Sequence, residues 1–141
     1  MKKKILDLDF LIKKIRRLPS VQIFNSKKKL IFEKFLKNYY FKDFNIIKIF
    51  NKKLIFKYIN FGNTDIFDTL IISELVVFDF YSRNKKNYKN VLDIGSNIGI
   101  HSIILSKLGF KVSAYEPDNI HYLILKNNIK NNKWKNIKTN K

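Results

Sequence analysis

Hydrophobic positions recur with different periods along this chain, and each period predicts an element. Near the N-terminus the apolar residues return every three or four positions, which predicts an amphipathic helix that ends at Pro19. Its apolar face consists of Ile5, Leu8, Leu11, Ile12 and Ile15. A basic helix of this kind also suits an anionic membrane surface, but packing against its own domain is the commoner use of such a face. A second helix is predicted over residues 28–38, with Ser26 as its N-terminal cap.

A change to short runs rich in Ile, Phe and Tyr marks the next region. Residues 45–50 and 54–60 are joined by Asn51-Lys52-Lys53, and this arrangement predicts a β-hairpin. Residues 66–81 are apolar almost all round, which predicts a helix that is buried on more than one side. We interpret residues 1–63 as an α+β N-terminal extension that contains this hairpin.

From Val91 onward the pattern becomes strand, glycine-rich turn, helix, strand and helix. The predicted elements are a strand from Val91 to Asp93 or Ile94, a turn over residues 95–99, a helix over 98–108, a strand over 111–115 and a helix over 118–131. This order predicts an α/β fold, namely an incomplete Rossmann-like, doubly wound parallel sheet that holds the first two strands and helices. We place this domain at residues 64–141, with Trp134 to Ile137 leading toward a third strand.

The formal net charge of +18 is typical of proteins that bind a polyanion such as nucleic acid. Lys, Asn and Ile number 26, 17 and 22 among the 141 residues, and all three have A/T-rich codons. A bias in nucleotide composition therefore explains the lysines, which are scattered instead of confined to one stripe. We do not expect a nucleic-acid partner, but a basic nucleic-acid-binding module remains an alternative.

The lack of cysteine removes several kinds of chemistry. Disulfides, thiolate metal sites and cysteine nucleophiles are all excluded. Asp7, Asp9 and Lys13 interrupt any apolar core of a signal peptide, and no run approaches the roughly 18 apolar residues of a membrane span. We therefore expect a cytoplasmic protein with no transmembrane segment.

The chemistry is concentrated where the two predicted parallel strands end. Asp93 lies at the carboxyl end of the first strand, the edge at which a parallel sheet binds its ligands. Gly95 and Gly99 allow the backbone to approach a ligand with positive φ. Glu116, which is 21 residues beyond Gly95, ends the second strand, where a carboxylate accepts hydrogen bonds from ribose hydroxyls.

The turn differs from a dinucleotide-binding fingerprint. In G-x-G-x-x-G the helix N-terminus receives a pyrophosphate, whereas here Asn97 occupies the place of the second glycine and would crowd that group. Asp93 would also repel a pyrophosphate, yet a carboxylate suits the cationic amino-acid end of S-adenosylmethionine. We therefore predict this cofactor, and a nicotinamide-dependent oxidoreductase is the alternative that Asn97 argues against.

The passages Asp-Ile-Gly-Ser-Asn-Ile-Gly and Tyr-Glu-Pro-Asp resemble class I S-adenosylmethionine-dependent methyltransferases, and the FkbM group in particular. Members of that group typically read D-[IV]-G-A-N-x-G and then F-E-P-[ND], so that Ser96 and Tyr115 are small departures. The resemblance implies O-methyl transfer to a small molecule or glycan. It also implies that Asp93, Gly95, Asn97 and Gly99 surround the methionine moiety and that Glu116 binds the ribose. The predicted cofactor-binding residues are Asp93, Gly95, Ser96, Asn97, Gly99, Glu116, Pro117 and Asp118.

Within this set Asp118 has two possible uses, as a contact to the adenine edge or as the N-terminal cap of the next helix, and we favour the cap. No residue is assigned a catalytic role and no metal site is predicted. His101 and His121 are interpreted as ordinary packing or surface histidines, since neither has an identifiable catalytic partner in the sequence.

Complete members of this group continue into further strands that carry the acceptor pocket, and this chain ends at Lys141. We therefore expect the chain to be incomplete, to show little turnover alone and to self-associate through its open sheet edge. A non-catalytic or degenerate cofactor-binding product is the remaining alternative.

Overall fold

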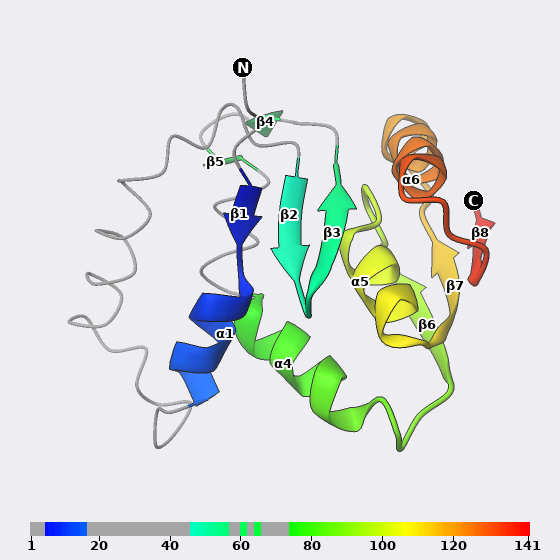
Figure 1. Cartoon of the computed structure of the whole chain (residues 1–141). Helices are drawn as coiled ribbons and strands as arrows, with labels where there is room; N and C mark the ends of the chain where they lie inside the picture. Colours follow the sequence, from blue (N-terminus) through cyan, green and yellow to red (C-terminus); the bar gives the residue numbers. More distant parts are fainter. Residues whose placement is uncertain (1–4, 17–45, 57–59, 62–63, 66–73) are drawn as a thin grey trace. The chain divides into compact units, whose positions relative to one another are not determined.

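The chain forms two compact units in the computed structural model, which describes residues 5–16, 46–56, 60–61, 64–65 and 74–141 (Figure 1). One unit comprises residues 1–53 and 58–76, and the other comprises residues 54–57 and 77–141. The predicted helix over residues 28–38, with its cap at Ser26 and the helix end at Pro19, lies outside the described residues.

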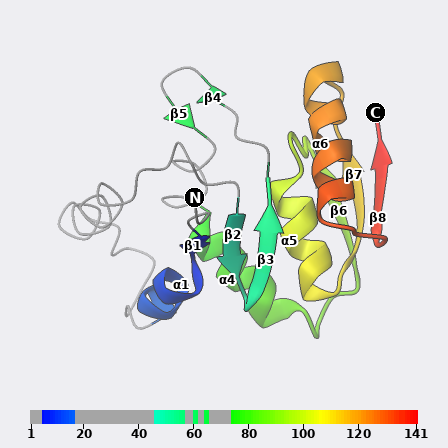
Figure 2. The same ribbon diagram turned by 45° about the horizontal axis from the view of Figure 1, so that its top comes forward.

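The first described element of the first unit is a strand instead of the predicted helix. β1 covers Ile5–Asp7 and pairs in parallel with β2, Ile46–Ile49, while α1 begins only at Asp9 and ends at Arg16 (Figure 2). The prediction of a helix from Ile5 was therefore wrong for its first turn. One physical reason is that Asp7 Oδ1 accepts the Asp9 N–H at 3.0 Å, which satisfies a free amide at the start of α1. The other is that residues 5–7 pair with β2, some forty residues away in the sequence.

The turn that follows β2 is tighter than the one in the predicted hairpin. β2 is followed by β3, Lys52–Ile55, in a sheet of order β1-β2-β3, and a short antiparallel pair, β4 at Asn60–Phe61 and β5 at Thr64–Asp65, follows. Phe50 and Asn51 form the turn with φ values of 50° and 58°, so the connection has two residues instead of the expected three. Two consecutive positive φ values are typical of the tight turns whose twist matches that of the strands.

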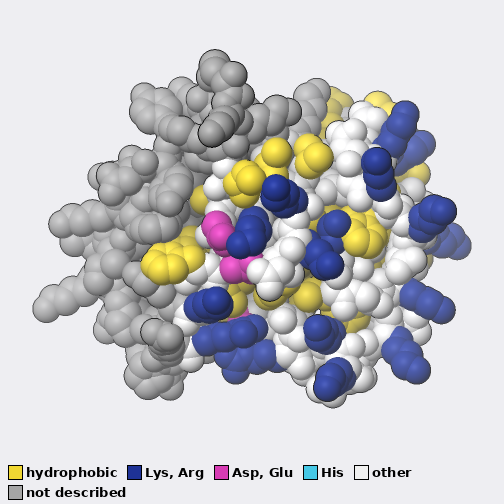
Figure 3. Space-filling view, in the orientation of Figure 1, with side chains coloured by type: hydrophobic (Ala, Val, Ile, Leu, Met, Phe, Trp, Pro, Cys, Tyr) yellow, Lys and Arg dark blue, Asp and Glu magenta, His cyan; other side chains and the backbone are white. Residues whose placement is uncertain are grey.

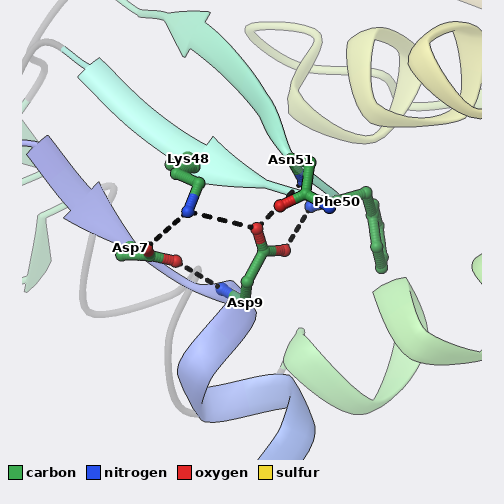
Figure 4. Close-up of polar contacts among 5 residues, drawn as sticks. All are labelled: Asp7, Asp9, Lys48, Phe50 and Asn51. Atoms are coloured by element: carbon green, nitrogen blue, oxygen red, sulfur yellow. Dashed lines mark hydrogen bonds and ion pairs between the residues drawn. The ribbon is translucent and has the colours of Figure 1, made fainter.

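Asp9 holds this turn in place (Figure 4). Its carboxylate accepts the backbone N–H groups of Phe50 and Asn51, the latter at 2.9 Å. Lys48 Nζ lies 2.8 Å from Asp7 Oδ2 and 3.9 Å from Asp9 Oδ2. The hydrogen bond to Asp7 raises the pKa of Lys48, so the ammonium stays charged and links the end of β1 to β2.

The second unit has the predicted strand–helix alternation. Its elements are β6 at Asn90–Ile94, α5 at Ile100–Leu108, β7 at Lys111–Tyr115, α6 at Asn119–Asn131 and β8 at Ile137–Asn140. All strand pairs are parallel in the order β6-β7-β8, which confirms a mixed α/β fold with a parallel sheet. The expectation of two strands was too low, because the run after Trp134 completes a third.

Both crossover helices cover the same face of this sheet (Figure 2). Right-handed crossovers that step twice in one direction require this arrangement. Leu105 of α5 packs there with Phe110 and Val112, and Val91 and Ile137 lie against this cluster. The opposite face is uncovered: Leu92, Ile94 and Tyr115 are 66%, 80% and 41% exposed.

α4, Leu75–Asn84, precedes β6 and corresponds to the end of the helix predicted over residues 66–81. Residues 66–73 lie outside the described part, and the helix continues three residues further than expected. Leu75 and Phe78 are fully buried, whereas Phe80 is 57% exposed, so burial on every side is not observed at this end. In the described residues no helix is long and apolar enough to span a membrane.

Candidate cofactor site

The candidate site is the glycine-rich turn between β6 and α5, which is docked on the end of β7. The N–H groups of Gly95 and Ser96 donate to the Tyr115 carbonyl oxygen at 2.9 and 3.0 Å, and the buried Ser96 Oγ lies 3.2 Å from the same atom. Gly99 N–H then donates to the Ser96 carbonyl at 2.8 Å, which closes the turn before the helix. These contacts place residues 95–99 at the carboxyl end of the parallel sheet, as the sequence predicted.

The two glycines of the turn have different surroundings. Gly95 has a φ of 72° and lies open, since a Cβ added there would meet no atom within 4 Å. Gly99 has a φ of 86°, but a Cβ there would lie 2.3 Å from Leu125 Cδ1 of α6. The open backbone at Gly95 therefore leaves room for a ligand, and Gly99 has a packing reason for its missing side chain. Asn97 between them has a φ of 49°, a conformation that Asn tolerates better than most residues.

Glu116 joins the turn to the end of β7. Its side chain is only 5% exposed, Oε2 accepts the Asn97 N–H at 2.6 Å and Oε1 accepts the Asp118 N–H at 2.9 Å. A carboxylate has about four lone-pair positions, so two positions remain for other donors. Glu116 thus holds the turn against the end of β7, and its contact with a ribose stays a prediction.

Asp118 caps α6, which confirms the interpretation that we favoured. Its Oδ1 accepts the N–H groups of Ile120 and His121 at 2.9 and 2.8 Å. These backbone hydrogen bonds, chiefly the one from His121, lower the pKa of the Asp118 carboxyl group. Pro117 is exposed in the short link between β7 and this cap.

Asp93 lies half-buried near the end of β6, beside the turn. Ser102 of α5, which is fully buried, lies with its Oγ 2.5 Å from Asp93 Oδ2. Sequence reasoning did not find this contact. The available signal was a serine among the apolar residues of the helix, where a buried hydroxyl needs a partner.

Asn128 of α6 is a second polar residue that the sequence did not single out. It is fully buried, and its Nδ2 donates to the Ile98 carbonyl of the turn at 2.9 Å. Leu125, one helical turn earlier, packs against Gly99. Both residues lie on the buried side of α6, so this side of the helix holds the turn in place.

Both histidines contact neighbouring side chains. His101 Nδ1 lies 3.0 Å from the Tyr81 hydroxyl, and its ring centroid lies 5.3 Å from that of Phe78. His121 Nδ1 lies 3.8 Å from Asp118 Oδ1. No group of three His, Cys, Asp or Glu side chains within the described residues has the arrangement of a metal site.

The described surface has a hollow and many basic side chains. A hollow of about 570 Å³ is lined by residues at the amino ends of β6, β7 and β8, including Lys111 and Lys138, so it is at the opposite end of the strands. Lys and Arg side chains are spread over the visible described surface instead of forming one stripe (Figure 3). The hollow is therefore separate from the candidate site.

Comparison with known proteins agrees with this architecture. No family model matches the chain, and no curated protein matches it. Among solved structures, a SAM-dependent methyltransferase from Agrobacterium tumefaciens aligns with a TM-score of 0.52 and 12% identity, over 67% of this chain and 30% of that one. The T. thermophilus 16S rRNA methyltransferase RsmC, in complex with AdoMet and guanosine, aligns with a TM-score of 0.51 and 19% identity, over 66% of this chain and 25% of that one.

The chain therefore spans less than a third of the length of either structure. At these identities the likeness establishes the fold alone: the matched region shares the α/β fold of these two structures, both of which are named as methyltransferases. Membership of the FkbM group remains a prediction from the two sequence passages.

Proposed function

We propose that the turn and the two strand ends bind S-adenosylmethionine and that the protein is a methyltransferase. The main support for this proposal is the open, positive-φ backbone of Gly95, with the carboxylates of Asp93 and Glu116 beside it. Two carboxylates suit a cofactor with an ammonium group and a ribose, and they oppose a pyrophosphate. The bound cofactor would supply an electrophilic methyl group on a sulfonium.

In this proposal the predicted residues serve different parts of the cofactor. Asp93, Gly95, Ser96 and Asn97 hold the methionine moiety, Gly99 keeps the turn against α6, and Glu116 binds the ribose. Pro117 and Asp118 lie on the adenine side. The cofactor-binding domain begins at residue 64, and no residue of this chain is assigned to the acceptor or to proton transfer.

The FkbM-like passages support O-methyl transfer to a small molecule or glycan, and the absence of cysteine supports a cytoplasmic setting. Calorimetric titration of the 141-residue chain with S-adenosylmethionine and with NADH tests the first step. We expect S-adenosylmethionine to bind more tightly, and Glu116→Gln to weaken it. Asp7→Asn removes the same charge in the first unit and serves as the matched control. Tighter binding of NADH would support the nicotinamide alternative and refute the proposal.

Nucleic acid is the second candidate acceptor, because the net charge is +18 and one structural neighbour is named as an rRNA methyltransferase. Binding of a short RNA duplex should then fall steeply with salt concentration. If this affinity is high and survives Glu116→Ala, the chain contains a basic binding surface that is independent of the cofactor. If cofactor binds without methylation of RNA or of sugar acceptors, the degenerate cofactor-binding interpretation is favoured.

A further inference from the structure

The contact between Ser102 and Asp93 connects the interior of α5 to the candidate site. Ser102 has no exposed surface, and its Oγ lies 2.5 Å from Asp93 Oδ2. A carboxylate only accepts hydrogen bonds, so the serine hydroxyl is the donor when Asp93 is ionised. In the described part of the chain no hydrogen bond reaches the other oxygen, Asp93 Oδ1.

The local structure explains why the hydroxyl points to Asp93. A buried serine in a helix often donates to the carbonyl four residues earlier. For Ser102 that carbonyl belongs to Ile98, and it already accepts the side-chain N–H of Asn128 at 2.9 Å. That carbonyl has a second lone pair, but the hydroxyl of Ser102 lies on the carboxylate of the neighbouring strand, which is the stronger acceptor when it is ionised.

We propose that Ser102 is a positioning residue, which fixes the Asp93 carboxylate so that Oδ1 receives the amino-acid end of S-adenosylmethionine. This inference rests on the proposed function. A neutral donor suits the task, because it restricts rotation of the carboxylate without cancelling the negative charge that attracts an ammonium group. A lysine or arginine in its place would compete with the ligand for the same charge.

Ser106 provides an internal comparison. It lies one turn further along α5, is 2% exposed, and its Oγ has no hydrogen-bond partner among the described residues. Ser102→Ala and Ser106→Ala thus remove the same atom from equally buried positions of one helix. Only the first removal frees a carboxylate of the site.

The test measures the affinity of the 141-residue chain for two ligands by calorimetric titration. S-adenosylmethionine carries the amino-acid end, whereas 5′-methylthioadenosine lacks it and keeps the adenosine. For Ser102→Ala we expect about a tenfold loss of affinity for S-adenosylmethionine, the size of one hydrogen bond to a charged group, and a change below about twofold for 5′-methylthioadenosine. Ser106→Ala should bind both ligands as the unsubstituted chain does. Ser102→Thr keeps the donor and should restore most of the affinity for S-adenosylmethionine.

Several outcomes overturn the inference. Unchanged binding of S-adenosylmethionine by Ser102→Ala would show that the contact is irrelevant to the ligand. An equal loss for both ligands would show that Ser102 only supports the fold. If the alanine variant does not fold, Ser102→Cys, which is close in size but a weak donor, is measured with the same ligand pair and read in the same way. If the unsubstituted chain binds neither ligand, the proposed function itself fails, which is a different result from failure of the serine variant alone.

Discussion

Replacing Gly99 by alanine tests how the glycine-rich turn is packed. The added Cβ would lie 2.3 Å from Leu125 Cδ1, whereas carbon atoms in contact are separated by about 3.5–4.0 Å. Leu125 is fully buried, so its side chain has little free space into which to move. The backbone must also keep a φ of 86°, which disfavours every residue with a Cβ.

The magnitude follows from these two contributions. The left-handed conformation costs alanine roughly 1–2 kcal/mol relative to glycine. Overpacking in a filled core costs roughly 1–3 kcal/mol more. We therefore expect Gly99→Ala to lower the free energy of unfolding by about 2–5 kcal/mol, a large part of the roughly 5–15 kcal/mol of an ordinary domain.

Urea denaturation followed by tryptophan fluorescence is the appropriate assay. Trp134 is the single tryptophan, and it lies in the second unit, so its signal reports on the unit that contains the turn. Gly109→Ala is the matched control, because Gly109 also has a positive φ of 102° but a Cβ there would meet nothing within 4 Å. The difference between the two variants isolates the contact with Leu125.

Two results would refute this reasoning. The first is a loss for Gly99→Ala that equals the loss for Gly109→Ala within about 0.5 kcal/mol, since the clash would then cost nothing. The second comes from a double-mutant cycle with Leu125→Ala. Removing the leucine side chain should reduce the cost of Gly99→Ala to about that of the backbone conformation, roughly 1–2 kcal/mol. Full additivity would show that the two residues do not interact.

Three further predictions follow from individual contacts. Asn128→Leu removes a buried hydrogen bond to the turn and should lower the free energy of unfolding by roughly 1–3 kcal/mol in the fluorescence assay. Asn127 is exposed, so Asn127→Leu should lower it far less, and equal effects of the two substitutions would contradict this prediction. In the folded chain the pKa of Asp118 lies below its ordinary value of 3.8. The carboxylate therefore stabilises the fold above pH 3.8, and this contribution is lost as the pH falls through the lower pKa of the folded state. Asp118→Ala should therefore lower the urea concentration at the unfolding midpoint near pH 7 and have a smaller effect near pH 2. An equal decrease in this midpoint at both pH values would count against the cap. Leu92 and Ile94 on the uncovered face should drive self-association, so Leu92→Ser with Ile94→Ser should lower the mass measured by light scattering, and a monomeric unsubstituted chain would disprove this.

The order of the α/β elements followed from the sequence because it depends on nearby residues. Val91, Val112 and Ala114 belong to two short runs; Gly95 follows the first run, and Gly109 ends the helix between the two. Period and turn chemistry need no knowledge of distant contacts, and the observed strands and helices lie within a residue or two of the predicted ones. The same local rule failed at Ile5–Asp7, where pairing with a strand some forty residues away decided the outcome.

The sequence by itself determined which chemistry this protein offers: an open glycine turn, Asp93 and Glu116 at the ends of two parallel strands, and a cap at Asp118. These features depend on residue type and short spacing. Only the tertiary structure decided that Glu116 holds the Asn97 amide, that Leu125 fills the space beside Gly99, and which buried polar side chains support the turn. The physical reason is that each of these contacts joins residues on different elements, and the packing of helix against sheet alone brings their atoms within hydrogen-bonding or van der Waals distance.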